Sequence, residues 1–162
     1  MYEQIIAKEA KIAVIGLGYV GLPIALEFAR KVSVIGFDIK EDRVEMIRKK
    51  KDPSQELPSS SFEGCDIEYT SDPEEIKGAK FYIVTVPTPI NEHNEPDLSP
   101  LISATHTVGK VLSKGDYVVF ESTVFPGATE EECVPVLEKE SGLQYISDFK
   151  VGFSPERINP GD

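Results

Sequence analysis

The sequence of 162 residues has the length of a single domain, and its 40% hydrophobic content is sufficient for one core. Its formal net charge of -11 argues against nucleic acid and anionic membrane surfaces as partners, because both would be repelled. No stretch approaches the ~18 consecutive apolar residues of a membrane-spanning helix, and residues 1–10 lack the pattern of a signal peptide. We therefore expect a cytoplasmic protein.

Short apolar runs alternate with longer segments of helical periodicity along the chain. This alternation is typical of βαβ units, so we predict an α/β fold with a doubly wound, Rossmann-type, mostly parallel sheet and helices on both faces. The expected strands span residues 11–15, 32–37, 81–86, 117–120 and 149–153, and a shorter strand at 67–70 should pair at an edge. The expected helices span residues 20–30, 43–51 and 101–112, and the expected surface loops span 52–64 and 87–97.

Two start signals mark helices in the second half of the chain. Ser99 followed by Pro100 predicts an N-cap and a first helical position for the helix at 101–112. Thr129 followed by three glutamates fits a capping box, which predicts a fourth helix there. Because a proline cannot donate a backbone hydrogen bond, Pro135 should kink or shorten that helix.

A glycine motif, G-x-G-x-x-G, begins where the first strand ends and continues into the first helix. Gly16 permits the tight turn, Gly18 lets the backbone approach a pyrophosphate, and Gly21 lets the helix pack closely on the sheet. Tyr19 and Val20 offer backbone N–H groups at the positive end of the helix dipole. Strand, motif and helix in this order predict a dinucleotide-binding loop.

Asp38 ends the second strand about 20 residues after Gly16, which is the usual offset of the acid that binds the adenosine ribose. A carboxylate there repels a 2′-phosphate, so we predict that NAD is preferred over NADP. Lys40 and Arg43 lie nearby and weaken this exclusion. The structural alternative is an aspartate that only caps the next helix, and it predicts no cofactor.

Polar groups at or after the later strands should meet at the carboxyl edge of the sheet, where ligands of doubly wound folds bind. Thr88 could contact the nicotinamide ribose or belong to a plain turn, and Thr123 could hold a water or simply favour the strand. Glu156 could act as a general base, and Arg157 could hold an anionic group or pair with Glu121. The candidate cofactor-binding residues at these ends are Val86, Pro87, Thr88, Glu121, Ser122 and Thr123.

The two cysteines, Cys65 and Cys133, lie far apart with no metal-ligand spacing and no adjacent histidine. We interpret both as ordinary thiols of a reducing compartment and predict no metal site.

Four motifs together resemble the UDP-glucose/GDP-mannose dehydrogenase family: Gly16-Leu-Gly-Tyr-Val-Gly-Leu-Pro23, Val86-Pro-Thr-Pro89, Glu121-Ser-Thr-Val124 with Pro126-Gly127, and Ser154-Pro-Glu-Arg-Ile-Asn-Pro-Gly161. The resemblance covers nearly the whole chain. Within the family, the motifs are most similar to those of enzymes that act on UDP-N-acetylglucosamine in surface-polysaccharide biosynthesis.

The resemblance implies an NAD-dependent oxidoreductase that oxidises the C6 alcohol of a UDP-N-acetylhexosamine to the uronic acid, using two NAD and a cysteine-bound intermediate. It implies that Tyr19, Val20, Asp38, Arg43, Thr88 and Thr123 bind NAD. It also implies that Thr123 and Glu156 are catalytic and handle a water near the reacting carbon, and that Glu156 and Arg157 border the nucleotide sugar.

The family's nucleophilic cysteine and substrate lysine belong to a later half that follows a long central helix, and Cys65 and Cys133 match neither role. The resemblance therefore implies that residues 1–162 are the NAD-binding domain of a longer enzyme, inactive alone, whose central helix and nucleotide-sugar-binding domain are absent and which is a homodimer at full length. Alternatives are a UDP-glucose or GDP-mannose 6-dehydrogenase and a stand-alone, non-catalytic NAD-binding module.

Overall fold

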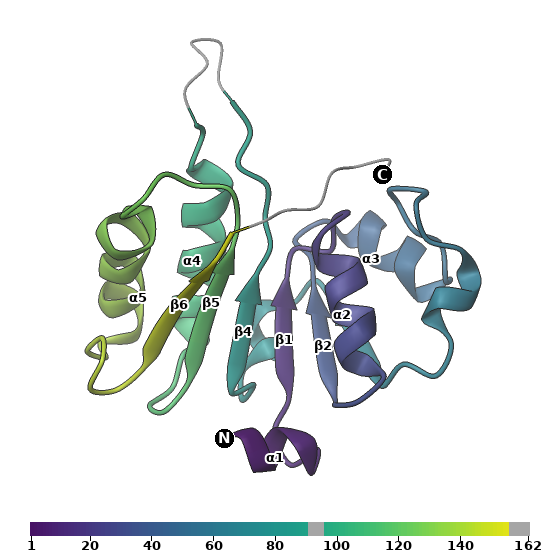
Figure 1. Cartoon of the computed structure of the whole chain (residues 1–162), viewed down its shortest axis with the longest axis horizontal. Helices are drawn as coiled ribbons and strands as arrows, with labels where there is room; N and C mark the ends of the chain where they lie inside the picture. Colours follow the sequence, from purple (N-terminus) through teal and green to yellow (C-terminus); the bar gives the residue numbers. More distant parts are fainter. Residues whose placement is uncertain (91–95, 156–162) are drawn as a thin grey trace.

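The computed structural model describes residues 1–90 and 96–155 of the chain. In this part, six strands form one sheet in the order β3-β2-β1-β4-β5-β6, and every neighbouring pair is parallel (Figure 1). The strands are β1 (Ile12–Ile15), β2 (Val34–Phe37), β3 (Ile67–Thr70), β4 (Phe81–Val84), β5 (Tyr117–Glu121) and β6 (Lys150–Ser154). The predicted doubly wound fold and the edge position of β3 are confirmed.

The α-helices of the described part are α1 (Tyr2–Ile6), α2 (Gly21–Ala29), α3 (Glu41–Arg48), α4 (Ser99–Val111) and α5 (Val134–Ser141). The three helices expected from apolar periodicity are α2, α3 and α4, with ends that differ by one to three residues. The short helix α1 and the 3₁₀ turns at Ser59–Phe62 and Pro73–Ile76 were not predicted, because such short segments carry little periodicity.

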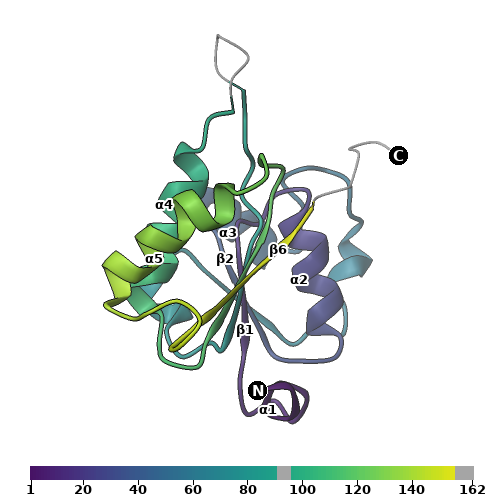
Figure 2. The same cartoon turned by 60° about the vertical axis from the view of Figure 1, so that its left-hand side comes forward.

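Two apolar clusters cover the two faces of the sheet. One contains Leu22 and Leu26 of α2 together with Ile47 of α3, and the other contains Leu101 of α4 and Leu137 of α5. Figure 2 shows α4 and α5 on one side of the strands and α2 on the other. Helices therefore lie on both faces, as the near-continuous apolar strands require.

Both predicted start signals of the later helices were wrong in detail. Helix α4 already includes Ser99, and the Ser99 backbone N–H donates to the carboxylate of Asp97 at 2.9 Å. Thr129 begins a π-helical turn, Thr129–Cys133, without a side-chain cap, and its side chain is buried. The regular helix α5 begins only at Val134, so the disturbance expected from Pro135 lies in the turn that precedes it.

The order of the strands creates a crevice at the centre of the sheet. Strand β1 pairs with β2 on one side and with β4 on the other, and the chain proceeds from β1 to β2 before it crosses back to β4. The connections that leave the carboxyl ends of β1 and β4 therefore go to opposite faces. In doubly wound sheets, ligands bind in the crevice that this reversal opens.

Candidate functional site

The glycine loop has the geometry that its sequence predicts. Gly16 has a φ of +97°, a region that residues with a Cβ rarely adopt. A Cβ on Gly21 would lie 1.8 Å from the carbonyl oxygen of Gly16, so α2 can approach the loop only because Gly21 has no side chain. A Cβ on Gly18, in contrast, would have no atom of the protein within 4 Å. Gly18 faces open space.

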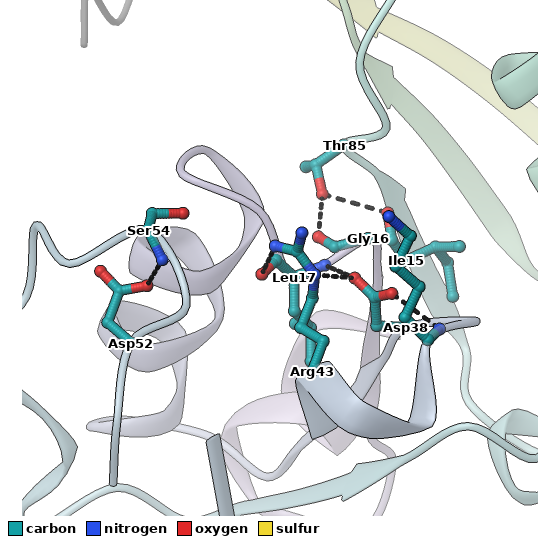
Figure 3. Close-up of polar contacts among 9 residues, drawn as sticks. Ile15, Gly16, Leu17, Asp38, Arg43, Asp52, Ser54 and Thr85 are labelled. Atoms are coloured by element: carbon teal, nitrogen blue, oxygen red, sulfur yellow. Dashed lines mark hydrogen bonds and ion pairs between the residues drawn. The ribbon is translucent and has the colours of Figure 1, made fainter. Parts of the chain in front are cut away.

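Thr85 fastens this loop to β4, and sequence analysis missed it. Its hydroxyl lies 2.7 Å from the carbonyl oxygen of Gly16 and 3.1 Å from that of Ile15, and its backbone N–H donates to Ile15 at 2.9 Å (Figure 3). We expected Thr85 inside a strand at 81–86, but β4 ends at Val84. The available signal was a buried hydroxyl in an otherwise apolar run.

Asp38 follows β2 directly and points at the glycine loop (Figure 3). Its carboxylate accepts the backbone N–H of Leu17 at 2.9 Å and that of Lys40 at 3.0 Å, and Arg43 Nε lies 3.5 Å away. A carboxylate has about four acceptor positions, so it can still accept from a ligand hydroxyl. The structural alternative, an aspartate that only caps the next helix, is not observed, because the N-cap of α3 is Lys40 and no side chain of the described residues caps that helix. Asp38 instead joins the turn before α3 to the glycine loop.

These features share one cleft of about 700 Å³ at the carboxyl edge of the sheet, a size typical of small-molecule sites. The cleft is lined by every predicted cofactor-binding residue except Gly21, which packs behind the loop. The predicted residues that line it are Gly16, Gly18, Tyr19, Val20, Asp38, Arg43, Val86, Pro87, Thr88, Glu121, Ser122 and Thr123.

The ends of β4 and β5 form one part of the cleft. The Ser122 hydroxyl donates to the carbonyl oxygen of Val86 at 3.0 Å, which ties the two connections together. Thr88 Oγ1 is buried and has no hydrogen-bond partner among the residues that the structure describes. A buried polar atom without a partner is costly, so Thr88 is a position where a polar ligand group fits. Thr123 is exposed in the same cleft.

The rest of the wall was not predicted. Helix α4 contributes Ser103 and Thr107, which lie four residues apart on one face, and the loop after α3 contributes Ser54. Ile39 follows Asp38, lines the cleft and has 72% of its surface exposed. Long loops and helix faces gain such positions only when the chain is folded, so spacing alone could not identify them.

Glu156 and Arg157 lie outside the described residues, so their predicted contacts with Thr123 and Glu121 stay predictions.

Neither cysteine resembles a nucleophile. Cys133 is buried, and burial raises the pKa of its thiol to about 11. Cys65 is half-buried, and its thiol lies 3.5 Å from the carbonyl oxygen of Leu26. Within residues 1–90 and 96–155, no three His, Cys, Asp or Glu side chains are grouped to hold a metal. No helix in that part is long and apolar enough to cross a bilayer.

Comparison with known proteins identifies one family. Residues 10–162 match the family model of the UDP-glucose/GDP-mannose dehydrogenase family, NAD binding domain. The chain is 58% identical to Protein CapL of Staphylococcus aureus over 93% of its length, and 53% identical to UDP-N-acetyl-D-glucosamine 6-dehydrogenase of Pseudomonas aeruginosa over 96%. It spans only 36% and 37% of these two proteins.

A solved structure agrees with this assignment. The structure of UDP-D-ManNAc dehydrogenase from Pyrococcus horikoshii superimposes on the chain with a TM-score of 0.82 and 37% sequence identity. The superposition covers 93% of this chain and 37% of that one.

Proposed function

This chain belongs to the UDP-glucose/GDP-mannose dehydrogenase family and matches its NAD-binding domain, and we propose that it is the N-terminal cofactor domain of a longer nucleotide-sugar 6-dehydrogenase. The full-length enzyme would oxidise the C6 alcohol of a UDP-N-acetylhexosamine to the uronic acid and reduce two NAD. The support for a longer protein is that the chain spans little more than a third of the relatives it matches.

The cleft at the carboxyl edge of the sheet is the observation that carries this proposal. The glycine loop, Asp38 and the ends of β4 and β5 line one continuous space, and Gly18 opens onto it. We assign the adenosine ribose to Asp38, the pyrophosphate to the backbone beside Gly18, and the nicotinamide ribose to Thr88 Oγ1. The first turn of α2 contains no acidic residue, so its dipole is available to the pyrophosphate.

The remaining site residues have supporting roles in the proposal. Arg43 donates to the carbonyl oxygen of Leu17 at 3.2 Å and so stands at the adenosine end. Thr123 would hold a water or a substrate oxygen near the nicotinamide, Glu156 would move a proton there, and Arg157 would contact the nucleotide sugar. The nucleophilic cysteine would come from the later part of the enzyme, because the thiol of Cys133 is buried and largely protonated near neutral pH.

The proposed substrate is a UDP-N-acetylhexosamine rather than UDP-glucose or GDP-mannose. The relative named for UDP-N-acetyl-D-glucosamine is 53% identical to the chain, whereas the structures named for GDP-mannose and UDP-glucose dehydrogenases are 26% and 27% identical. We further propose that the full-length enzyme is a homodimer.

The test is a steady-state assay of the full-length enzyme with NAD and each of UDP-N-acetylglucosamine, UDP-N-acetylmannosamine, UDP-glucose and GDP-mannose. We expect NADH formation with at least one of the two UDP-N-acetylhexosamines and a yield of two NADH per sugar consumed. Activity with only UDP-glucose or GDP-mannose would refute the substrate. A chain that binds NAD as part of a protein that oxidises none of these sugars would favour the non-catalytic module.

A further inference from the structure

The loop between α3 and β3 is organised around one buried carboxylate. Asp52 is 8% exposed, and its side chain accepts the backbone N–H groups of Ser54 at 2.8 Å, Glu56 at 2.9 Å and Leu57 at 2.9 Å. The backbone N–H of Gln55 also donates to the carbonyl oxygen of Asp52 at 3.1 Å. Hydrogen bonds to an ionised group are stronger than neutral ones, so this carboxylate holds the loop in one shape.

The buried charge of Asp52 is balanced by these donors. Among the ion pairs within the described residues, none includes Asp52, so its negative charge is compensated by backbone N–H groups. Leu57 packs against the apolar cluster on the α2 face of the sheet, which anchors the far end of the loop. Burying a carboxylate costs free energy unless hydrogen bonds compensate it. The backbone N–H groups that compensate Asp52 do so only while the loop keeps this shape.

Ser54 is the residue of this loop that reaches the cleft. It lines the same cleft as Lys40, Arg43 and Asp38. Figure 3 shows Ser54 beside Asp52, with Arg43 between it and Asp38 in this view. Its backbone N–H is already occupied by Asp52, so the group that it offers to a ligand is its hydroxyl. The loop thereby adds a neutral donor and acceptor to a cleft that is also lined by charged side chains.

We propose that the Ser54 hydroxyl binds the adenosine half of NAD and that Asp52 is a positioning residue that holds Ser54 at the cleft. This inference rests on the proposed function, because it assumes that the Asp38 end of the cleft receives the adenosine. It adds a contact from a part of the chain beyond the glycine loop and the strand ends.

The test uses Ser54→Ala, Ser54→Thr and Asp52→Asn in the full chain. An asparagine side chain keeps one acceptor oxygen but replaces the other by an NH₂ group that cannot accept, so Asp52→Asn loses at least one of the three loop bonds. The matched control is Asp72→Asn, because the Asp72 carboxylate also accepts a backbone N–H, that of Glu74 at 2.9 Å, but does not line the cleft. NAD affinity is measured by calorimetry, and AMP and nicotinamide mononucleotide by competition.

We expect Ser54→Ala to weaken the binding of NAD and of AMP by the same factor of about two- to tenfold, the value of one hydrogen bond. The affinity for nicotinamide mononucleotide should not change. Ser54→Thr, which keeps the hydroxyl, should restore most of the loss. Asp52→Asn should weaken NAD binding in the wild-type background. It should weaken NAD binding no further in the Ser54→Ala background, because Asp52 acts through Ser54. Asp72→Asn should bind as wild type.

Two results overturn the inference. Ser54→Ala that binds NAD and AMP as tightly as wild type would show that the hydroxyl makes no contact. Equal losses from Asp52→Asn with and without Ser54 would show that Asp52 does not act through it. Either result leaves the proposed function intact when the wild-type chain binds NAD, whereas a wild-type chain that binds neither NAD nor AMP refutes both. Ser54→Ala alone decides the contact if Asp52→Asn does not fold.

Discussion

Substitutions at Gly18 and Gly21, the second and third glycines of the motif, should separate folding from cofactor binding. In Gly21→Ala, the new Cβ would lie 1.8 Å from Gly16 O and 2.3 Å from Thr85 Oγ1. A carbon and an oxygen normally approach to about 3.3 Å, so α2 would have to move by roughly 1.5 Å. Both atoms in contact are part of the bond that holds the loop to β4, the Thr85 hydroxyl to Gly16 O at 2.7 Å.

Overpacking of this kind costs about 1–3 kcal/mol, and the lost hydrogen bond adds about 1 kcal/mol. We therefore expect Gly21→Ala to lower the free energy of unfolding by about 2–4 kcal/mol, which corresponds to roughly 5–15 °C in Tm for a domain of this size. Urea unfolding followed by circular dichroism measures the first value. NAD binding should also be lost, because the displaced helix carries the loop with it.

Gly18→Ala is the control for this prediction. A Cβ at Gly18 meets no protein atom within 4 Å, so the free energy of unfolding should change by no more than about 1 kcal/mol. The methyl group would enter the cleft where we place the pyrophosphate, so NAD affinity measured by calorimetry should fall by at least about tenfold. Gly21→Ala with wild-type stability, or Gly18→Ala with wild-type NAD affinity, would refute the reasoning.

Three further predictions concern single side chains. NAD should raise the Tm of the chain more than NADP does, and Asp38→Ala should narrow that difference, because it removes the charge that repels a 2′-phosphate; equal shifts in the wild type would contradict this role. Burial raises the pKa of Cys133 to about 11, so the thiolate fraction of Cys133 at pH 8 is about one in a thousand. Iodoacetamide should therefore alkylate Cys65 before Cys133, and peptide mass spectrometry can establish the order. Asp116 is fully buried and accepts a hydrogen bond from Lys80 Nζ at 2.9 Å. Asp116→Ala should lower the free energy of unfolding, measured by urea unfolding, by about 3 kcal/mol. NAD affinity should stay unchanged, because the pair lies at the amino edge of the sheet.

Most of the fold could be predicted from the sequence because strands and helices are encoded by patterns of neighbouring residues. Apolar runs identified five of the six strands in the described part of the chain, and the short edge strand Ile67–Thr70 was predicted with its observed ends. Element ends were less accurate where a signal had two meanings. Thr129 with three glutamates fits a capping box, yet Thr129 is buried and begins a π-helical turn. Packing of the side chain against the core prevailed over its capping preference there.

In the candidate site too, local motifs could be predicted, whereas positions that depend on packing could not. Motif spacing predicted Gly16 and Asp38 because a dinucleotide loop needs a turn with positive φ and an acid at the end of the next strand. Thr85, Ser54 and Ser103 were not predicted, because their part in the cleft depends on which segments the sheet order brings together.

Sequence alone determined the family, the fold class and the cofactor loop of this protein, because a strand, a glycine motif and a helix are consecutive in the chain. The tertiary structure decided which hydroxyls line the cleft and which are occupied within the protein. Ser122 donates to Val86, whereas Thr88 Oγ1 has no partner in the described part of the chain. Two hydroxyls with the same local setting differ in this way because hydrogen bonding depends on which backbone groups the fold places within reach.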